Sequence, residues 1–179
     1  MYSPAEVARR YVETGKSKAA LPVGRMLLLG MLAGAFIALA GGSATFAVSY
    51  GGGLAGAAVF PAGLAMVLLA GSELFTGNCL LVIPLLERQL TWGRMLRSWG
   101  VVYLANVLGA GSVAALTVAA GTFDGVYESV VATAAAKAGL PFLTALLRGV
   151  LCNFLVCIAV WMSLAAQSVP GKLAAMYLP

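Results

Sequence analysis

The sequence predicts an all-α, polytopic membrane protein that forms a single transmembrane domain over residues 1–179. Only 9% of the 179 residues are charged and 61% are hydrophobic, and the mean hydropathy is +0.97. A soluble domain has roughly a quarter of its residues charged, so this chain lacks the polar residues to cover a surface in water. A β-barrel would need segments of about ten alternating polar and apolar residues, whereas the apolar runs here do not alternate.

Residues 3–20 predict an amphipathic helix that lies on the membrane surface. Ser3 and Glu6 have the spacing of a capping box, which marks the start of a helix. Val7 and Tyr11 fall on one side of this helix and the charged residues on the other. Because the segment has no apolar core, it is not a cleavable signal peptide.

Four apolar stretches predict membrane-spanning helices, and a fifth begins near the end of the sequence. A helix crosses the hydrocarbon core with about 20 apolar residues. The predicted spans are 27–47, 57–86, 99–120 and 146–166, with the start of a fifth at 172–179. In the first span, Gly30, Gly34 and Ala38 form a stripe of small residues that permits close approach to another helix in lipid.

The distribution of Lys and Arg predicts the orientation of the chain. Lys137 and Arg148 fall on one side of the predicted spans, and the other nine of the 11 basic residues fall on the opposite side. Because basic residues concentrate in cytoplasmic loops, the N-terminus is predicted to be cytoplasmic, in a protein of the inner (cytoplasmic) membrane. Topology thus accounts for the net charge of +5, and nucleic acid is not an expected partner.

The second predicted span is interrupted at 71–78 by the polar, glycine-containing sequence GSELFTGN. A carboxylate at the membrane centre costs roughly 2.5–3.5 kcal/mol on insertion scales, and irregular backbone at that depth occurs where it is buried in protein or lines a cavity. We therefore predict a helix broken into 57–70 and 79–86, whose second half points its N-terminus at the membrane centre and favours an anion. The alternative is a kinked helix in which Glu73 pairs with a neighbour.

Several blocks of this sequence resemble the formate/nitrite transporter family. They are 73–78 (ELFTGN), 90–93 (LTWG), 103–109 (YLANVLG) and 148–163 (RGVLCNFLVCIAVWMS). The resemblance covers essentially the whole chain. It implies an aquaporin-like fold of inverted repeats in a lipid bilayer, assembled as a homopentamer. It also implies a channel or transporter for small monovalent anions, such as formate, nitrite or hydrosulfide, that is linked to protons.

The resemblance also assigns roles to individual residues. Thr76 is similar to the family threonine that hydrogen-bonds a central histidine, Asn153 to a pore-facing asparagine, and Lys137 to a vestibule lysine that attracts anions. The positions that resemble the apolar pore constrictions are Phe60, Leu64, Leu74, Phe75 and Val156. The residues alone leave other roles open: packing for the apolar side chains, interhelical hydrogen bonding for the asparagine, and a solvated charge for the lysine.

The sequence departs from the family pattern near its end. The family histidine lies in a second broken span, but this sequence contains no histidine and stops at Pro179, where the first half of that span would end. We therefore expect a truncated chain that lacks the last one and a half spans.

Two other classes of function stay open. A neutral-solute channel of aquaporin type would show two Asn-Pro-Ala-like loops and a pore arginine, and neither is visible. A non-transporting, truncated membrane scaffold is compatible with the early end of the sequence. No nucleophile–base pair or metal-ligand cluster is visible, so we expect neither an enzyme nor a metal or cofactor site.

Overall fold

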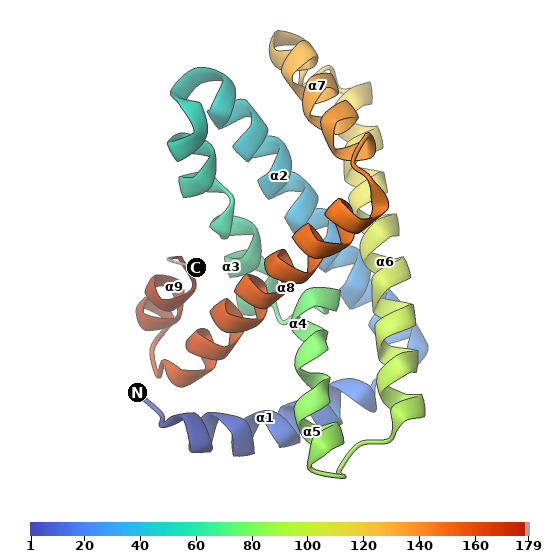
Figure 1. Cartoon of the computed structure of the whole chain (residues 1–179), viewed down its shortest axis with the longest axis vertical. Helices are drawn as coiled ribbons and strands as arrows, with labels where there is room; N and C mark the ends of the chain where they lie inside the picture. The colour runs from blue at the N-terminus through green and yellow to red at the C-terminus, as the bar shows by residue number, and fades with distance from the viewer. Residues whose placement is uncertain (178–179) are drawn as a thin grey trace.

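The computed structural model describes residues 1–177, and every regular element in that range is helical (Figure 1). The longer helices are α1 (Pro4–Ala19), α2 (Val23–Val59), α3 (Pro61–Ala70), α6 (Trp92–Ala119), α7 (Tyr127–Ala138), α8 (Phe142–Ala165) and α9 (Val169–Tyr177). The short elements are α4 (Phe75–Asn78), η1 (Cys79–Leu81), α5 (Val82–Leu86) and η2 (Asp124–Val126). Among the described residues, three stretches are long and apolar enough to cross a membrane, with α2 and α3 counted as one. The predicted all-α, polytopic fold class is confirmed.

Helix α1 begins with the predicted capping box and lies across one end of the molecule (Figure 1). The Ser3 hydroxyl accepts from the Glu6 backbone N–H, and the Glu6 carboxylate accepts from the Ser3 backbone N–H at 2.8 Å. These hydrogen bonds hold the pKa of the Glu6 carboxyl below its ordinary value. Val7 and Tyr11 are buried, and α1 contacts η1, α5, α6 and α8. The apolar face of this helix therefore packs against protein.

Helices α2 and α6 run side by side along the length of the molecule and form its most extensive helix pair (Figure 1). A Cβ atom added at Gly34 would collide with the backbone carbonyl of Asn106, and one added at Gly109 would collide with that of Met31. The two backbones are thus in direct contact at these glycines. The small residues of the first span do permit the close helix approach that the sequence predicts.

Gly52 allows the chain to fold back within α2. Its φ of +73° lies in the left-handed range that glycine adopts without strain. Figure 1 shows α2 reversing at its far end and returning toward α3. The residues after Gly52 and helix α3 together form the first half of the broken span.

The second span is broken as predicted, but the break is shorter. Helix α3 ends at Gly71, whose φ of +68° gives a left-handed C-cap. The non-helical segment extends only to Leu74, and helix resumes at Phe75. Residues 75–78, predicted to be loop, form α4, and the backbone N–H of Phe75 at its start is capped by the side chain of Asn106 on α6.

The helices also extend beyond the predicted spans. Helix α2 begins at Val23 rather than at 27, α6 at Trp92 rather than at 99, and α8 at Phe142 rather than at 146. The predicted spans began after charged residues such as Arg25 and Arg97. Long basic side chains can reach water from within the end of a helix, so they do not mark where the backbone stops being helical.

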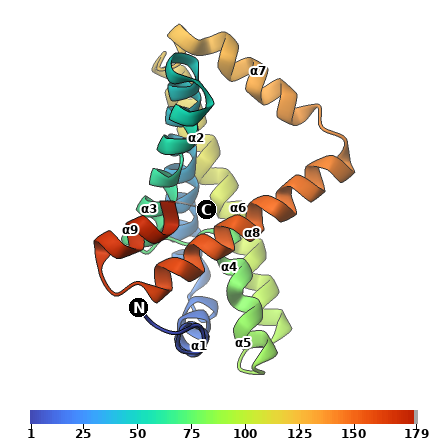
Figure 2. The same ribbon diagram turned by 60° about the vertical axis from the view of Figure 1, so that its left-hand side comes forward.

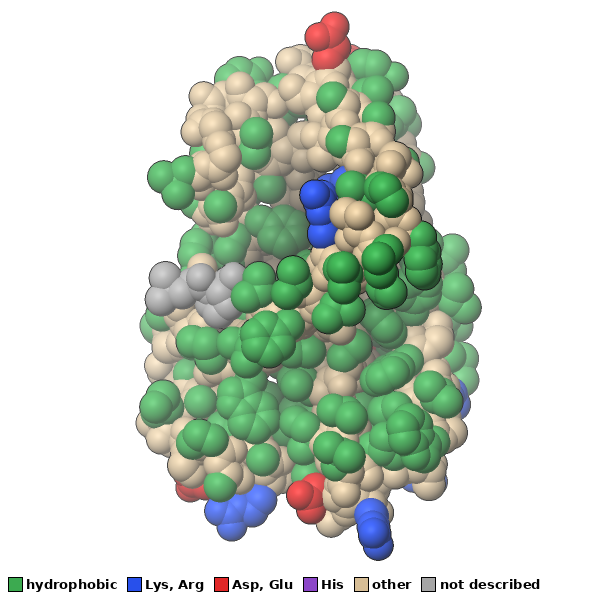
Figure 3. Space-filling model, in the orientation of Figure 1, with side chains coloured by type: hydrophobic (Ala, Val, Ile, Leu, Met, Phe, Trp, Pro, Cys, Tyr) green, Lys and Arg blue, Asp and Glu red, His purple; other side chains and the backbone are tan. Residues whose placement is uncertain are grey.

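Helices α7 and α8 form an arm that projects from the α2–α6 pair and returns across it (Figure 2). Helix α7 has no buried residue. Helix α9 packs against α8 and α3 and starts at Val169, before the predicted 172; positions 178–179 of that predicted segment lie outside the described residues. Apolar side chains dominate the middle of the face in Figure 3, and charged groups gather at its lower end.

Candidate functional site at the broken helix

Asn106 of α6 holds the break in place with three hydrogen bonds. Its amide nitrogen donates to the carbonyl of Gly30 at 2.8 Å and to that of Glu73 at 2.9 Å. Its amide oxygen accepts from the backbone N–H of Phe75 at 2.9 Å. One side chain therefore joins α2, the break and the first turn of α4. The N-terminus of the second half-helix was predicted to face the membrane centre. At Phe75 its backbone N–H is instead capped by the Asn106 side chain.

Glu73 is 4% exposed and forms an ion pair with Lys18 of α1, whose Nζ lies 2.9 Å from Oε1. Asn78 completes a triangle: its amide nitrogen donates to Glu73 Oε2 at 2.8 Å, and its amide oxygen accepts from Lys18 at 3.2 Å. The carboxylate is thus both paired and hydrogen-bonded, as a buried charge requires. The broken helix and the paired glutamate, treated as alternatives from the sequence, occur together.

Sequence reasoning missed Lys18 because it grouped this residue with the solvated charges of the surface helix. A usable signal was present. Lys18 follows the buried Tyr11 by seven residues, which is close to two helical turns, so the two side chains leave α1 on the same side.

The end of α4 is held from both sides. The Tyr11 hydroxyl donates to the carbonyl of Gly77 at 3.3 Å, and the Trp99 indole donates to that of Asn78 at 2.8 Å. Burial raises the pKa of Tyr11 above its ordinary value, so the phenol stays protonated and remains a donor. Helices α1 and α6 therefore fix the half-helix after the break.

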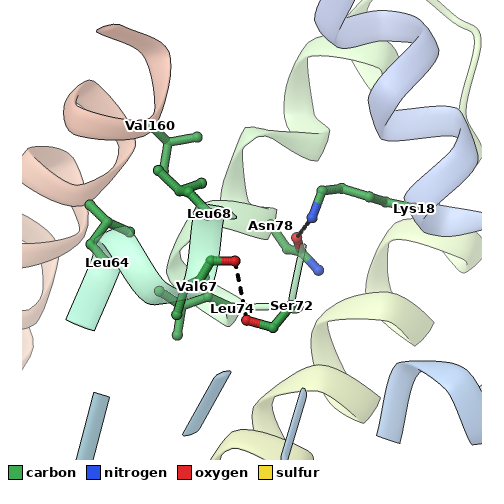
Figure 4. A pocket seen from close by; sticks show the side chains of 9 residues that line it. Lys18, Leu64, Val67, Leu68, Ser72, Leu74, Asn78 and Val160 are labelled. Carbon is green, nitrogen blue, oxygen red and sulfur yellow. Dashed lines mark hydrogen bonds between the residues drawn. The ribbon is translucent and has the colours of Figure 1, made fainter. Parts of the chain in front are cut away.

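A small cavity of about 30 Å³ lies beside the break (Figure 4). Its polar lining comes from Lys18, Ser72 and Asn78, and Figure 4 shows the Lys18 amine pointing at Asn78. Its apolar lining comes from Leu64, Val67, Leu68, Leu74 and Val160. This volume holds about a water molecule. The apolar side chains line the space beside the polar cluster.

The predicted constriction residues lie in two different surroundings. Leu64 and Leu74 line the cavity, and Val156 packs against the same apolar cluster. Phe60 is 46% exposed and does not line this cavity.

The ring of Phe75 packs edge-to-face against α6. Its centroid lies 5.3 Å from that of Tyr103 and 6.2 Å from that of Trp99, with interplanar angles of 74° and 76°. Phe75 is not among the residues that line the cavity. Its aromatic contacts anchor the start of α4 to α6.

Thr76 and Asn153 both lie at the contact of the half-helix with α8, where Cys157 reaches the Thr76 carbonyl and the Asn153 amide oxygen. The hydroxyl oxygen of Thr76 is buried and has no hydrogen-bond partner among residues 1–177. The Asn153 amide nitrogen donates to the sulfur of Cys79 at 3.1 Å. Asn153 thus makes an interhelical contact with the half-helix, close to the predicted loop threonine.

Lys137 is exposed in the last turn of α7, a helix without buried residues. It does not line the cavity at the break. Attraction of anions by Lys137 at the outer entrance of the pore therefore stays a prediction.

The site and the fold together define a class of protein. Apolar helices of membrane-spanning length pack around a helix that is broken at a polar segment with a buried, paired carboxylate, which is the architecture of membrane channels and transporters. The sequence pattern that defines the formate/nitrite transporter family matches residues 5–179. The chain belongs to the formate/nitrite transporter family, as its sequence blocks predict.

Individual relatives agree with this assignment. The chain is 38% identical over 187 residues to the uncharacterized transporter YrhG of Bacillus subtilis (strain 168), covering 98% of this chain and 70% of that protein. Its fold matches a solved FNT family ion channel with a TM-score of 0.83 and 26% identity, covering 97% of this chain and 73% of the other. A solved pentameric formate channel with formate bound matches with a TM-score of 0.73 and 28% identity. The match covers 88% of this chain and 66% of the channel.

Proposed function

We propose that this chain lines the pore of a channel or transporter for small monovalent anions, with formate as the first candidate. The observation that carries the proposal is the break between α3 and α4, where the apolar lining of a cavity adjoins a buried polar cluster. The related structure with formate bound supports the choice of substrate. Nitrite and hydrosulfide, which are also small and monovalent, are the alternatives to test beside it.

The proposed assembly is a homopentamer in the lipid bilayer. Large apolar side chains on α6 and α8, such as Leu104 and Phe154, are more than half exposed in the isolated chain. Such surfaces need lipid or another apolar surface to cover them, and the related formate channel is pentameric.

Proton linkage follows from the cost of moving a charge through the constriction. A bare anion entering a space lined by Leu64, Leu74 and Val160 loses its hydration, which costs several kcal/mol or more. A weak acid that takes up a proton at the constriction avoids this cost. Formate uptake should therefore increase as the external pH falls.

The proposed orientation places the N-terminus in the cytoplasm. A second cavity, of about 320 Å³, lies between α1 and the end of α8 and includes Arg10 and Lys172 in its lining. The N-terminus is tied to this region by a hydrogen bond from the Tyr2 N–H to the Ala165 carbonyl at 2.9 Å. We assign this basic cavity as the cytoplasmic entrance, in a protein of the inner membrane.

Uptake by proteoliposomes tests the proposed function. Vesicles that contain the protein should take up labelled formate faster than protein-free vesicles and should not take up glycerol faster. Glycerol uptake without formate uptake would indicate the aquaporin-type alternative. If neither solute enters well-folded, correctly inserted protein, the scaffold alternative is favoured.

Replacing Leu64 by alanine is expected to increase formate flux severalfold and to lower selectivity against larger monocarboxylates. The change removes a side chain that lines the cavity between α3 and α8 and leaves a space in its place. Phe60→Ala is the matched control on the adjoining turn, and it should have a smaller effect because Phe60 does not line the cavity. Equal effects of both changes on flux and selectivity would contradict this assignment.

Replacing Lys137 by glutamine is expected to reduce formate uptake roughly threefold at limiting concentration and little at saturation, because a charge at a pore entrance raises the local anion concentration. The effect should shrink at high ionic strength. Lys16→Gln removes an equal charge from α1, where Lys16 pairs with Glu13, and provides the control. Unchanged uptake at limiting formate concentration would contradict the proposal that Lys137 attracts anions to the pore.

A further inference from the structure

Two cysteines lie at the contact between the half-helix and α8. Cys79 is the first residue of η1 and Cys157 belongs to α8, and both thiols are free and partly buried. The third cysteine, Cys152, is also on α8 but is exposed. Neither the ion pair at Glu73 nor the apolar cavity uses these thiols.

The side-chain amide of Asn153 bridges the thiols of Cys79 and Cys157. Cys79 Sγ accepts from the Asn153 amide nitrogen at 3.1 Å, and the Cys157 thiol donates to the Asn153 amide oxygen at 3.3 Å. The Cys79 thiol donates to the carbonyl of Phe75 on α4 at 3.5 Å, and the carbonyl of Thr76 lies 3.3 Å from Cys157 Sγ as a second acceptor for its single S–H. The side-chain amide of Asn153 and the carbonyls of α4 therefore lie within hydrogen-bond distance of both thiols.

We propose that Cys79 and Cys157 form a binding site for a soft, two-coordinate divalent cation of the mercuric type. Thiolates are the protein ligands that soft cations prefer. Binding breaks two S–H bonds, forms two metal–sulfur bonds and releases two protons to solvent, so it needs no oxidant.

The charge and the number of ligands select this class of ion. Two thiolates and one divalent ion make a neutral complex, whereas a monovalent ion would leave a net negative charge in the low-dielectric interior. Zinc favours four protein ligands in a structural site. No group of three or more His, Cys, Asp or Glu residues that could hold a metal occurs within the described part of the chain.

Occupation of the site would add a metal bridge between two elements that are joined by hydrogen bonds and apolar packing. Cys79 follows directly after α4, and Cys157 lies one helical turn after Asn153 on α8. A metal bridge would fix the half-helix to α8 beside the break. The expected inhibition of formate flux rests on the proposed function, but binding itself does not.

Protection of thiols from alkylation tests the site in the unmodified protein. Detergent-extracted protein is treated with one equivalent of mercuric chloride, washed with a monothiol and then labelled with N-ethylmaleimide. Mass spectrometry gives the intact mass, and peptide mapping locates the label. We expect a retained mercury ion, a single label, and that label on Cys152. Labelling of Cys79 or Cys157, or removal of mercury by the monothiol, would overturn the proposal.

Variants locate the two ligands. Cys152→Ser should keep the wild-type affinity for the mercuric ion in competition with the monothiol. Cys79→Ser and Cys157→Ser should each lower that affinity by about a hundredfold or more, because the second sulfur no longer binds intramolecularly. Thermal melting checks that each variant is folded. Wild-type affinity in either variant would overturn the proposal, and the result does not depend on whether the protein transports formate.

Discussion

Replacing Lys18 by methionine is expected to destabilise the protein by about 3 kcal/mol, because it leaves the Glu73 carboxylate buried without its cation. Side-chain exposures of 26% for Lys18 and 5% for Glu73 mean that the carboxylate has little contact with bulk water to compensate for the lost cation. The hydrogen bond from Asn78 remains and limits the loss. A large drop in melting temperature, measured in detergent, would show the effect.

Lys16→Met is the matched control on the same helix. The Lys16–Glu13 pair has side-chain exposures of 40% and 72%, and exposed ion pairs contribute about 0–1 kcal/mol. Its loss should hardly change the melting temperature. Combining Lys18→Met with Glu73→Gln should recover much of the lost stability, since no unpaired charge is then buried. Equal effects of the Lys16 and Lys18 changes would contradict the role given to the Lys18–Glu73 pair.

Replacing Gly109 by alanine is the second change from which we expect a large effect. The added Cβ would collide with the backbone carbonyl of Met31, and a backbone carbonyl cannot turn away as a flexible side chain can. Helices α2 and α6 would have to separate, which breaks the packing on which helix association in lipid depends. Overpacking of this kind costs about 1–3 kcal/mol or more.

Gly111→Ala tests whether this loss comes from the helix contact. Gly111 lies on the same helix, and a Cβ added there meets no atom within 4 Å. Alanine is also the better helix former by about 1 kcal/mol. We therefore expect Gly111→Ala to leave the melting temperature unchanged or higher and Gly109→Ala to lower it. Similar losses in both variants would mean that the α2–α6 contact does not depend on Gly109.

The sequence contained enough information to predict the fold class and the break in the second span. Long apolar runs specify spanning helices in lipid, and a polar segment at mid-span is too costly to occur without a structural reason. The extent of the break was not predictable from local pattern, because the group that caps the first residue of α4 is Asn106, on another helix.

The site was harder to predict for the same reason. Glu73 was identified by its position in an apolar run, but its partner Lys18 lies 55 residues earlier in the chain. Leu68 and Val160 line the cavity beside Leu64 and Leu74, and they carry no local feature that distinguishes them from other apolar helix residues. Tertiary contacts, rather than residue type, select which apolar side chains surround the cavity.

The most direct test of the central claim is to measure formate uptake in proteoliposomes that contain either the wild-type protein or Leu64→Trp. If the solute path runs past the break between α3 and α4, the larger side chain should reduce uptake at least about tenfold, because the cavity holds only about 30 Å³. Phe60→Trp, with equal insertion and melting temperature, should transport like the wild type. Undiminished uptake in folded Leu64→Trp protein would contradict the account, since formate would then cross elsewhere.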